Sequence, residues 1–382
     1  MPSYNVGAYI GECIESVVSQ TLKDIEIICI DAGSTDETLE ILEKFAAKDE
    51  RIRLLHSDVK SYGYQMNMGL ASACGEYIGI VETDDFIAPD MYEELYRLTN
   101  CGKIDIVKGS FWFYYSYTDG TPSQKKLHEM PGIPVGEKLS LQNCPELVRG
   151  HPSIWSAIYR REFLERNYIR FIEAPGGGWV DNPFLFETMC AAECVVWTDK
   201  PYYYYRQTNP NSSSNRQPDL TVPIRRMLDN LDVVEKYRIT NRETLIYVYE
   251  RIWNTIWDVQ HRTEYAGQEE QVLPWIKKML LRLDPEFVRQ NFDFSQQYLF
   301  YTNISPLRIL GANAAGPASD EKISISSSDL QLILAENDFL RSSVEPLRSA
   351  ALDLESIENG LSYRIGRSLT WPLRKMRALI GR

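Results

Sequence analysis

Short apolar strands alternate with amphipathic helices over the first hundred residues, and this alternation constrains the fold more than any other feature. The expected strands are residues 25–30, 52–56 and 77–81, and the expected helices are residues 8–20, 36–48 and 64–73. The first helix places Ile10, Ile14 and Val17 on one face, as a helix packed against a sheet requires. The order predicts βαβ units and therefore an α/β fold with a mainly parallel sheet flanked by helices.

A sheet of this kind needs a strand before the first helix. Ser3-Tyr4-Asn5 looks like the loop that leaves such a strand. We therefore expect that the chain starts inside its first strand, through truncation or a misplaced start codon. Mass spectrometry of the native protein tests this expectation.

Three carboxylates follow the predicted strand at 77–81, in Glu82-Thr83-Asp84-Asp85. Ligands of open α/β sheets bind beyond the carboxyl ends of the strands, where these residues emerge. Oxygen ligands without a nearby His or Cys suit Mg²⁺ or Mn²⁺, which take the rest of their shell from phosphate and water. The cluster indicates a metal–diphosphate site. The alternative is a solvated turn that caps the helix beginning near Pro89.

Composition excludes several classes of protein. The chain has 382 residues, 44% of them hydrophobic, and a net charge of -12, which argues against nucleic acid as a partner. Seven scattered cysteines and four histidines indicate neither a disulfide framework nor a zinc site, so reducing cytosol is the simplest compartment. No apolar run reaches the roughly 18 residues of a membrane-spanning helix.

Seven segments carry a resemblance to a known family. They are Pro2-Ser3-Tyr4-Asn5, Ser19-Gln20-Thr21, Ile30-Asp31-Ala32-Gly33-Ser34-Thr35-Asp36, Asp49-Glu50-Arg51-Ile52, Asn67-Met68-Gly69, Ala73-Cys74-Gly75-Glu76-Tyr77-Ile78 and Thr83-Asp84-Asp85. In this order they resemble the motifs of glycosyltransferase family 2, which has the GT-A fold, over about residues 1–215. The resemblance implies transfer of a sugar from a nucleotide diphosphate donor, usually a UDP-sugar, with Mn²⁺ or Mg²⁺ and inversion at the anomeric carbon.

The resemblance also implies roles for individual residues on the donor side. Tyr4 would line the base pocket, Asp31 would contact the nucleoside, and Asp84 would accept hydrogen bonds from the ribose. Asp85 would be the first metal ligand, and Glu82 an accessory ligand or its supporting partner. A metal held by such carboxylates neutralises the diphosphate leaving group without proton transfer.

On the acceptor side, the segment from Gly176 to Phe184 is similar to the family's loop that carries the general base. Asp181 matches the base, and partial enclosure by Trp179 would raise its basicity. A plain N-cap is the alternative for Asp181. Gly176 to Gly178 would let the loop close over the substrate.

The chain departs from the family pattern at Ala32 and Val180, where relatives commonly carry an acid. Ala32 leaves the base specificity open.

Three further side chains are candidates for substrate contacts. Arg206 ends a tyrosine-rich strand and would approach the diphosphate or the acceptor, together with Ser212 to Ser214. Trp155 and Trp179 would stack on an acceptor sugar, although burial in the core is an equal alternative for both. The histidines, among them His128 and His151, show no metal spacing and are interpreted as structural or surface residues.

Four regions are expected. Residues 1–217 form the glycosyltransferase domain, 218–320 a helical extension, 321–358 a short coiled coil and 359–382 a basic amphipathic tail. In the coiled coil, Asn337 would fix the register of a homodimer, but Pro346 interrupts the heptads and packing on the same chain is the alternative. The tail would bind an anionic membrane surface, with packing on the acidic body of the protein as the alternative.

Together these features predict a cytoplasmic enzyme, peripheral on the inner face of the cell membrane, that extends a cell-surface polysaccharide or a lipid-linked oligosaccharide. The competing interpretation is a nucleotide- or sugar-binding protein of the same fold without turnover. Nucleotidyl transfer is disfavoured because no Gly-rich, Lys/Arg-bearing loop follows the first strand.

Overall fold

The computed structural model describes residues 1–117, 121–176, 178–212, 219–262, 267–293, 296–297, 299–300, 303 and 335. The chain divides into two compact units, residues 1–282 and 283–382. In the second unit, helix α10 (Pro285–Asn291) is capped by the Asp284 carboxylate, which accepts from the backbone N–H groups of Glu286 and Phe287. Apart from residue 335, the predicted coiled coil and basic tail lie outside the described residues.

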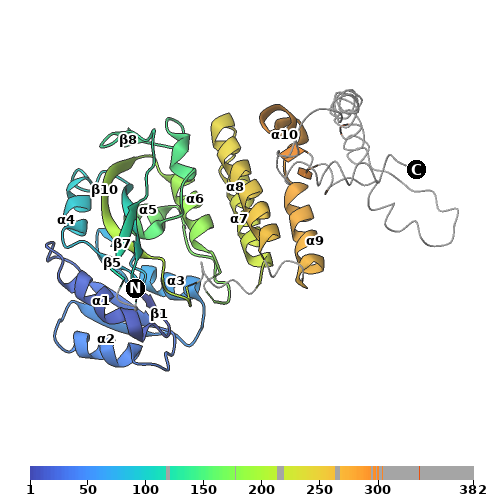
Figure 1. Ribbon diagram of the computed structural model, residues 1–382. Helices are drawn as coiled ribbons and strands as arrows, with labels where there is room; N and C mark the ends of the chain where they lie inside the picture. Colours follow the sequence, from blue (N-terminus) through green and yellow to red (C-terminus); the bar gives the residue numbers. More distant parts are fainter. Residues whose placement is uncertain are drawn as a thin grey trace. The chain divides into compact units, whose positions relative to one another are not determined.

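A three-stranded parallel sheet, in the order β1-β2-β3, forms the N-terminal part of the first unit (Figure 1). Its strands are β1 (Pro2–Ser3), β2 (Ile27–Asp31) and β3 (Ile52–His56), and its helices are α1 (Gly7–Val18), α2 (Thr38–Ala46) and α3 (Tyr62–Ser72). The strand expected before the first helix is thus β1. Gln65 ties α3 to both neighbouring strands, because its amide nitrogen donates to the carbonyls of Ser3 and Ile30.

A second sheet of seven strands continues the unit, in the order β4-β9-β6-β10-β5, with β7 on β6 and β8 on β10. The strands are β4 (Tyr77–Gly79), β5 (Phe86–Ile87), β6 (Ile106–Tyr115), β7 (Gln124–Leu127), β8 (Lys138–Leu139), β9 (Ala157–Arg160) and β10 (Val195–Arg206). Only β6 and β10 pair in parallel here, and the other pairs are antiparallel. The α/β prediction is confirmed, but the second sheet is mixed, because most of its strand pairs are antiparallel.

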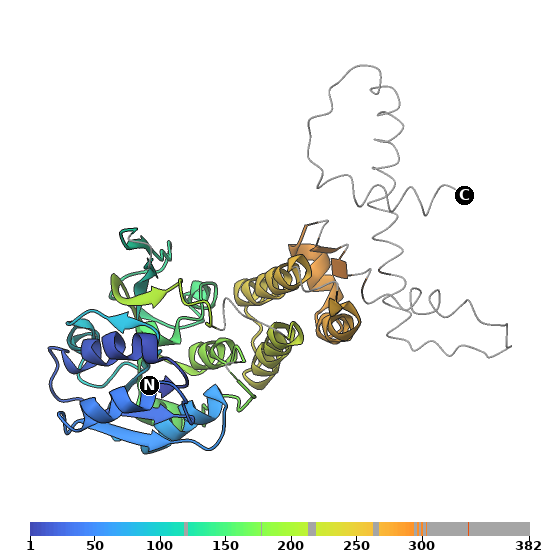
Figure 2. The ribbon, with the colours of Figure 1, turned by 60° about the horizontal axis from the view of Figure 1, so that its bottom comes forward.

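Helices cover the sheets and extend the unit beyond them (Figure 2). They are α4 (Met91–Arg97), α5 (Arg161–Arg166), α6 (Asp181–Ala191), α7 (Thr221–Lys236), α8 (Arg242–His261) and α9 (Glu269–Leu280), with the 3₁₀ turns η1 (Pro145–Val148) and η2 (Ile154–Ser156). Helix α7 packs against α6, α8 and α9. The boundary predicted at residue 217 therefore falls inside a compact unit.

The helices of this unit bury apolar faces, as their sequence periodicity predicts. In α1, for example, Ile10, Cys13, Ile14 and Val17 are buried. Within the described part of the chain, no helix combines the length and the hydropathy that crossing a membrane would require.

Candidate active site

A cleft of about 620 Å³ opens where the ends of β1 and β4 meet the start of α3, the start of α6 and one side of α8. Most of the residues that the sequence singles out line this cleft: Tyr4, Glu82, Asp84, Asp85, Trp155, Trp179 and Asp181. Asp31 and Arg206 lie behind its wall. The topology therefore brings the predicted donor and acceptor residues together.

The carboxylate cluster forms a turn after β4, in which the Asp85 N–H donates to the Glu82 carbonyl. Asp85 is 1% exposed, and both of its carboxylate oxygens are occupied. Oδ1 accepts from the backbone N–H of Arg206 at 2.7 Å, and Oδ2 accepts from the Tyr203 hydroxyl at 2.9 Å. Burial and the charge of Asp84 raise the pKa of Asp85 well above its usual range. Asp85 thus braces the turn, a role the sequence prediction did not assign to it.

Asp84 has the opposite environment, although it is the adjacent residue. Its side chain is half-buried in the cleft wall, and Oδ2 accepts from the Asn209 amide at 2.8 Å. Oδ1 has no hydrogen-bond partner among the residues that the structure describes. The alternative prediction, a capping turn, does not describe this segment: α4 begins at Met91, and neither aspartate caps it.

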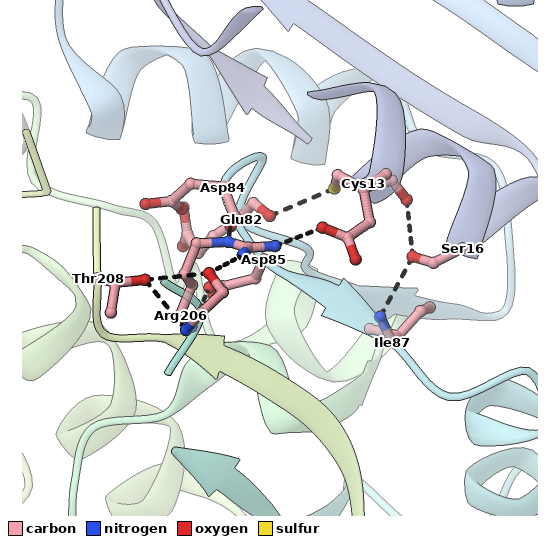
Figure 3. A network of polar contacts seen from close by, with 10 residues as sticks. Cys13, Ser16, Glu82, Asp84, Asp85, Ile87, Arg206 and Thr208 are labelled. Atoms are coloured by element: carbon pink, nitrogen blue, oxygen red, sulfur yellow. Dashed lines mark hydrogen bonds and ion pairs between the residues drawn. The ribbon is translucent and has the colours of Figure 1, made fainter. Parts of the chain in front are cut away.

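Arg206 supports this turn from behind the cleft (Figure 3). Its Nε donates to the Asp84 carbonyl at 2.8 Å, and its Nη atoms donate to Ser116 at 2.9 Å and to the carboxylate of Glu12 at 2.5 Å. The side chain is 5% exposed and does not line the cleft. The expectation that Arg206 approaches the substrate therefore does not fit this geometry, because its donors serve the protein.

Tyr62 connects the carboxylate turn to the acceptor side. Its hydroxyl donates to Oε1 of Glu82 at 2.5 Å, and all three of Tyr62, Glu82 and Asp181 line the cleft. Burial, together with the negative charges of Asp84 and Asp181, raises the pKa of Glu82 to about 7, although the hydrogen bond from Tyr62 opposes the rise. This part of the cleft therefore favours bound protons or a cation.

Asp181 is the first residue of α6, where the helix dipole favours a negative charge. Its Oδ1 accepts from the backbone N–H of Asn182 at 3.0 Å and from the Asn182 amide at 3.2 Å. Burial nevertheless raises the pKa of Asp181 to about 6, while those hydrogen bonds and the charge of Arg251 oppose the rise. A carboxylate with this pKa is ionised at neutral pH and basic enough to take a proton.

Arg251 of α8 contacts the surroundings of Asp181 from the opposite wall of the cleft. Its guanidinium donates to the Gly150 carbonyl at 2.6 Å and to the side-chain oxygen of Asn182. Because Asn182 in turn donates to Asp181, the three residues form one chain of hydrogen bonds. This contact comes from a helix beyond the region of family resemblance.

One end of the cleft is built from Tyr4, Ala32 and Lys60. Lys60 Nζ donates to the Tyr4 hydroxyl at 2.9 Å and lies 4.6 Å from the ring centre. Asp31 lies beneath this surface, and its Oδ2 accepts from the N–H groups of Gly33 and Ser34. Its Oδ1 is buried and accepts no hydrogen bond from the described residues. Such an oxygen can accept a hydrogen bond from a bound ligand.

The two predicted tryptophans occupy different settings. Trp155 is 4% exposed and stacks on Tyr203 with ring centres 4.1 Å apart, so it is both a core residue and part of the cleft wall. Trp179 has φ of 55°, a backbone conformation that costs non-glycine residues about 1–3 kcal/mol and that clusters at active sites.

The loop that carries Trp179 is fixed at one end. The N–H of Gly176 donates to the Lys60 carbonyl, and the carbonyl of Gly176 accepts from the N–H of Tyr62. This part of the predicted closing loop is therefore anchored to the start of α3.

Several cleft residues escaped the sequence prediction: Lys60, Tyr62, Arg149, Arg251, Asn254, Thr255 and Asp258. The last four lie on one side of α8, at a spacing of three to four residues, and such a polar stripe in an otherwise apolar helix was the available signal.

The residues present fit a divalent cation that is shared with a diphosphate. In the described portions of the chain, no three His, Cys, Asp or Glu side chains cluster as a self-sufficient metal site. Asp84 Oδ1 and Glu82 Oε2 nevertheless carry no hydrogen bond from any described residue. Mg²⁺ and Mn²⁺ are commonly held by one or two carboxylates plus phosphate oxygens, which is the donor set available here.

Comparison with known proteins shows a family similarity over part of the chain. Residues 1–167 match the family described as Glycosyl transferase family 2. The chain is 34% identical over 224 residues to the uncharacterized glycosyltransferase EpsJ of Bacillus subtilis, covering 56% of this chain and 61% of EpsJ. It is 32% identical over 222 residues to the cholesterol galactosyltransferase of Borreliella burgdorferi, covering 56% and 60% of the two chains. The match thus spans about three fifths of either relative.

Among solved structures, residues 1–349 of S. aureus TarS in complex with UDP-GlcNAc superpose with a TM-score of 0.65. The alignment covers 79% of this chain and 85% of the TarS 1–349 chain at 18% identity, so it establishes the fold alone. The predicted GT-A fold is confirmed.

Proposed function

We propose that the protein is an inverting, metal-dependent glycosyltransferase, because residues 1–167 match the family described as Glycosyl transferase family 2. It moves a sugar from a nucleotide diphosphate donor, a UDP-sugar by preference, to a hydroxyl of a glycan or lipid-linked oligosaccharide. The observation that carries the proposal is that a carboxylate with a pKa near 6, Asp181, shares one cleft with the Asp84 turn.

On the donor side, Tyr4 and Asp31 contact the nucleoside and Asp84 contacts the metal and diphosphate. We move the metal contact from Asp85 to Asp84, with Glu82 beside it. Each Asp85 oxygen already accepts a hydrogen bond, from Tyr203 or from Arg206, whereas Asp84 Oδ1 accepts none from the described residues and lies in the cleft wall. When bound, the cation neutralises the charge that develops on the departing diphosphate.

On the acceptor side, Asp181 takes the proton of the acceptor hydroxyl as that oxygen bonds to the anomeric carbon. The bond from this carbon to the diphosphate oxygen breaks in the same step, with inversion. Asn182 orients the carboxylate, and Arg251 holds Asn182. Trp155, Trp179 and the polar side of α8 form the wall against which the acceptor lies.

The name of one relative supports a lipid acceptor. Cholesterol, the acceptor named for the Borreliella relative, is a membrane lipid. An acceptor of this kind brings the enzyme to the inner face of the cell membrane, where we place it.

The first test is thermal stabilisation of the full chain by UDP, GDP, CDP and dTDP, each with and without Mn²⁺. We expect a metal-dependent rise in Tm with one nucleotide, UDP. The Asp84→Asn variant should lose the metal-dependent part of the rise, and Glu37→Gln, an exposed acid away from the cleft, should keep it. If Asp84→Asn responds like the wild type, the donor site is assigned wrongly.

The second test separates an enzyme from a binding protein. Asp181→Asn should lower the rate of donor consumption in the presence of acceptor by about 10²–10⁴ while nucleotide stabilisation persists. Glu162→Gln is a matched control, because Glu162 also lies in the first turn of a helix, α5, outside the cleft. Nucleotide binding by the wild type without any turnover would favour the non-catalytic alternative, which the departures at Ala32 and Val180 motivate.

A further inference from the structure

Lys108 is a buried cation without an ion pair among the described residues. It lies on β6, where its register neighbours are Ala157 of β9 and Trp197 of β10, and it is 4% exposed. An ammonium group in the core costs free energy unless all three of its N–H donors find partners. The hydrogen-bond partners of Lys108 therefore indicate which part of the structure this buried charge stabilises.

All three acceptors lie in one short turn. Nζ donates to the Ser153 carbonyl, to Ser153 Oγ at 2.8 Å and to Ser156 Oγ at 3.0 Å. The serine hydroxyls direct their own hydrogens elsewhere, Ser153 to the His151 carbonyl at 3.3 Å and Ser156 to the Ser153 carbonyl at 3.0 Å. Each of the three contacts therefore needs a hydrogen from Lys108.

The same turn forms a wall of the cleft. His151, Pro152 and Trp155 line the cleft, while Ser153 and Ser156 point back into the core. Trp155 stacks on Tyr203, the tyrosine that donates to Asp85. A displacement of residues 153–156 would thus reach both the acceptor wall and the carboxylate turn.

We infer that Lys108 is a positioning residue whose three hydrogen bonds fix the 153–156 turn, and with it Trp155, for binding of the sugar acceptor. The link to the acceptor rests on the proposed function, whereas the link between Lys108 and the turn does not. Lys108 itself touches no part of the cleft surface.

Deprotonation of the Lys108 side chain should loosen the 153–156 turn, which gives a pH-dependent test of the inference. Burial lowers the pKa of Lys108 to about 7, so the amine begins to lose its third N–H in the neutral range. A neutral amine has two donors for three acceptors, and its lone pair then faces an oxygen.

The other titratable groups near this cluster are His128, His151 and Arg251. Burial lowers the pKa of His128 to about 4 and that of His151 to about 3, with the charge of Lys108 contributing to both. Both rings are therefore uncharged above pH 6. Arg251 keeps its charge throughout this range, so the turn should loosen as Lys108 alone loses its proton between pH 6 and 8.

Amide hydrogen exchange of the full chain tests this inference, because the N–H groups of Ser153, Ile154 and Ser156 bond within the turn. In Lys108→Met, exchange over residues 153–157 should accelerate at least tenfold at pH 6, a factor that corresponds to about 1.4 kcal/mol. The midpoint of global unfolding should change little, because loss of a buried charge stabilises the protein while the three acceptors left without a donor destabilise it, and all three lie in this turn. A uniform acceleration with a lower midpoint would mean that Lys108 is merely structural and would overturn the inference.

Two further measurements decide the case if Lys108→Met does not fold. In the wild type, exchange in the turn should increase between pH 6 and 8 beyond its intrinsic base-catalysed rise, and the β2 strand should show no such excess. Ser156→Ala, which removes one acceptor, should accelerate exchange in the turn but by a smaller factor. Absence of both effects refutes the role of Lys108. Failure of the proposed function would appear instead as absence of nucleotide stabilisation in the wild type, and would leave the exchange results unchanged.

Discussion

Removal of the Tyr203 hydroxyl should test most directly how the carboxylate turn is held in place. The side chain is completely buried on β10, where its hydroxyl donates to Asp85 Oδ2 at 2.9 Å and accepts from the Glu82 N–H at 3.0 Å. Tyr203→Phe keeps the ring that stacks on Trp155 and removes only these two bonds. It therefore leaves a buried carboxylate oxygen and a backbone N–H without a partner.

The expected cost follows from these two groups. Each unsatisfied buried polar group costs about 1–3 kcal/mol, and the charged one lies at the upper end, so the free energy of unfolding should fall by about 3–4 kcal/mol. Tyr77→Phe is the matched control, since the Tyr77 hydroxyl makes one neutral bond to the Ile104 carbonyl at 2.6 Å, away from the cleft. Its loss should cost about 1 kcal/mol.

The pH dependence of this difference adds a second check. A carboxyl whose pKa is raised on folding contributes stability at low pH and loses it as pH rises toward the folded pKa. Asp85 is such a group, and loss of the Tyr203 donor should raise its pKa further. The penalty of Tyr203→Phe should therefore grow with rising pH.

The assay is urea unfolding of both variants at pH 5 and pH 8, combined with Mn²⁺-dependent nucleotide binding. Tyr203→Phe should also weaken nucleotide binding, because the turn that it supports presents Asp84 to the cleft. Our account of the turn is refuted if Tyr203→Phe costs no more than Tyr77→Phe at either pH.

The remaining predictions concern the base and two backbone positions. The kcat/KM for transfer should rise with pH around a midpoint near 6 as Asp181 loses its proton, and a pH-rate profile with no such limb would contradict the assignment. Gly63→Ala should destabilise the protein, because a Cβ would lie 2.0 Å from the Ile172 carbonyl oxygen, whereas Gly11→Ala, with open space around it, should stabilise by up to about 1 kcal/mol in thermal unfolding. Trp179→Gly should gain about 1 kcal/mol of stability by relieving the positive φ, and should weaken acceptor binding; equal or lower Tm would argue against strain there.

Local periodicity was enough to predict the N-terminal elements. The strand expected at residues 52–56 is β3, and the helix expected at 36–48 is α2, which runs from Thr38 to Ala46. The shorter start has a local cause. Asp36 uses one carboxylate oxygen for the N–H of Thr38 and the other for the N–H of Gly7, at the start of α1, so it links two helices instead of continuing one.

The far wall of the cleft could not be predicted in this way. Helix α8 begins 75 residues after the last residue of the matched region. Its own sequence does not indicate which part of the protein it packs against. Arg251 reaches Asn182 only because α7 packs against both α6 and α8. Contacts of this length depend on tertiary packing, which a periodic pattern does not encode.

Asp84 and Asp85 show why a motif alone assigns roles poorly. Both are acids after the same strand, and their sequence context does not distinguish a metal ligand from a structural brace. The distinction is made by β10, more than a hundred residues away, which supplies Tyr203 and the Arg206 N–H to one of the two side chains. We therefore assign the substrate contact to Asp84, the aspartate with fewer protein partners, as part of the proposed function. The same reasoning assigns Arg206 to the scaffold, since each of its three side-chain nitrogens donates to the protein, at the Asp84 carbonyl, Ser116 and Glu12.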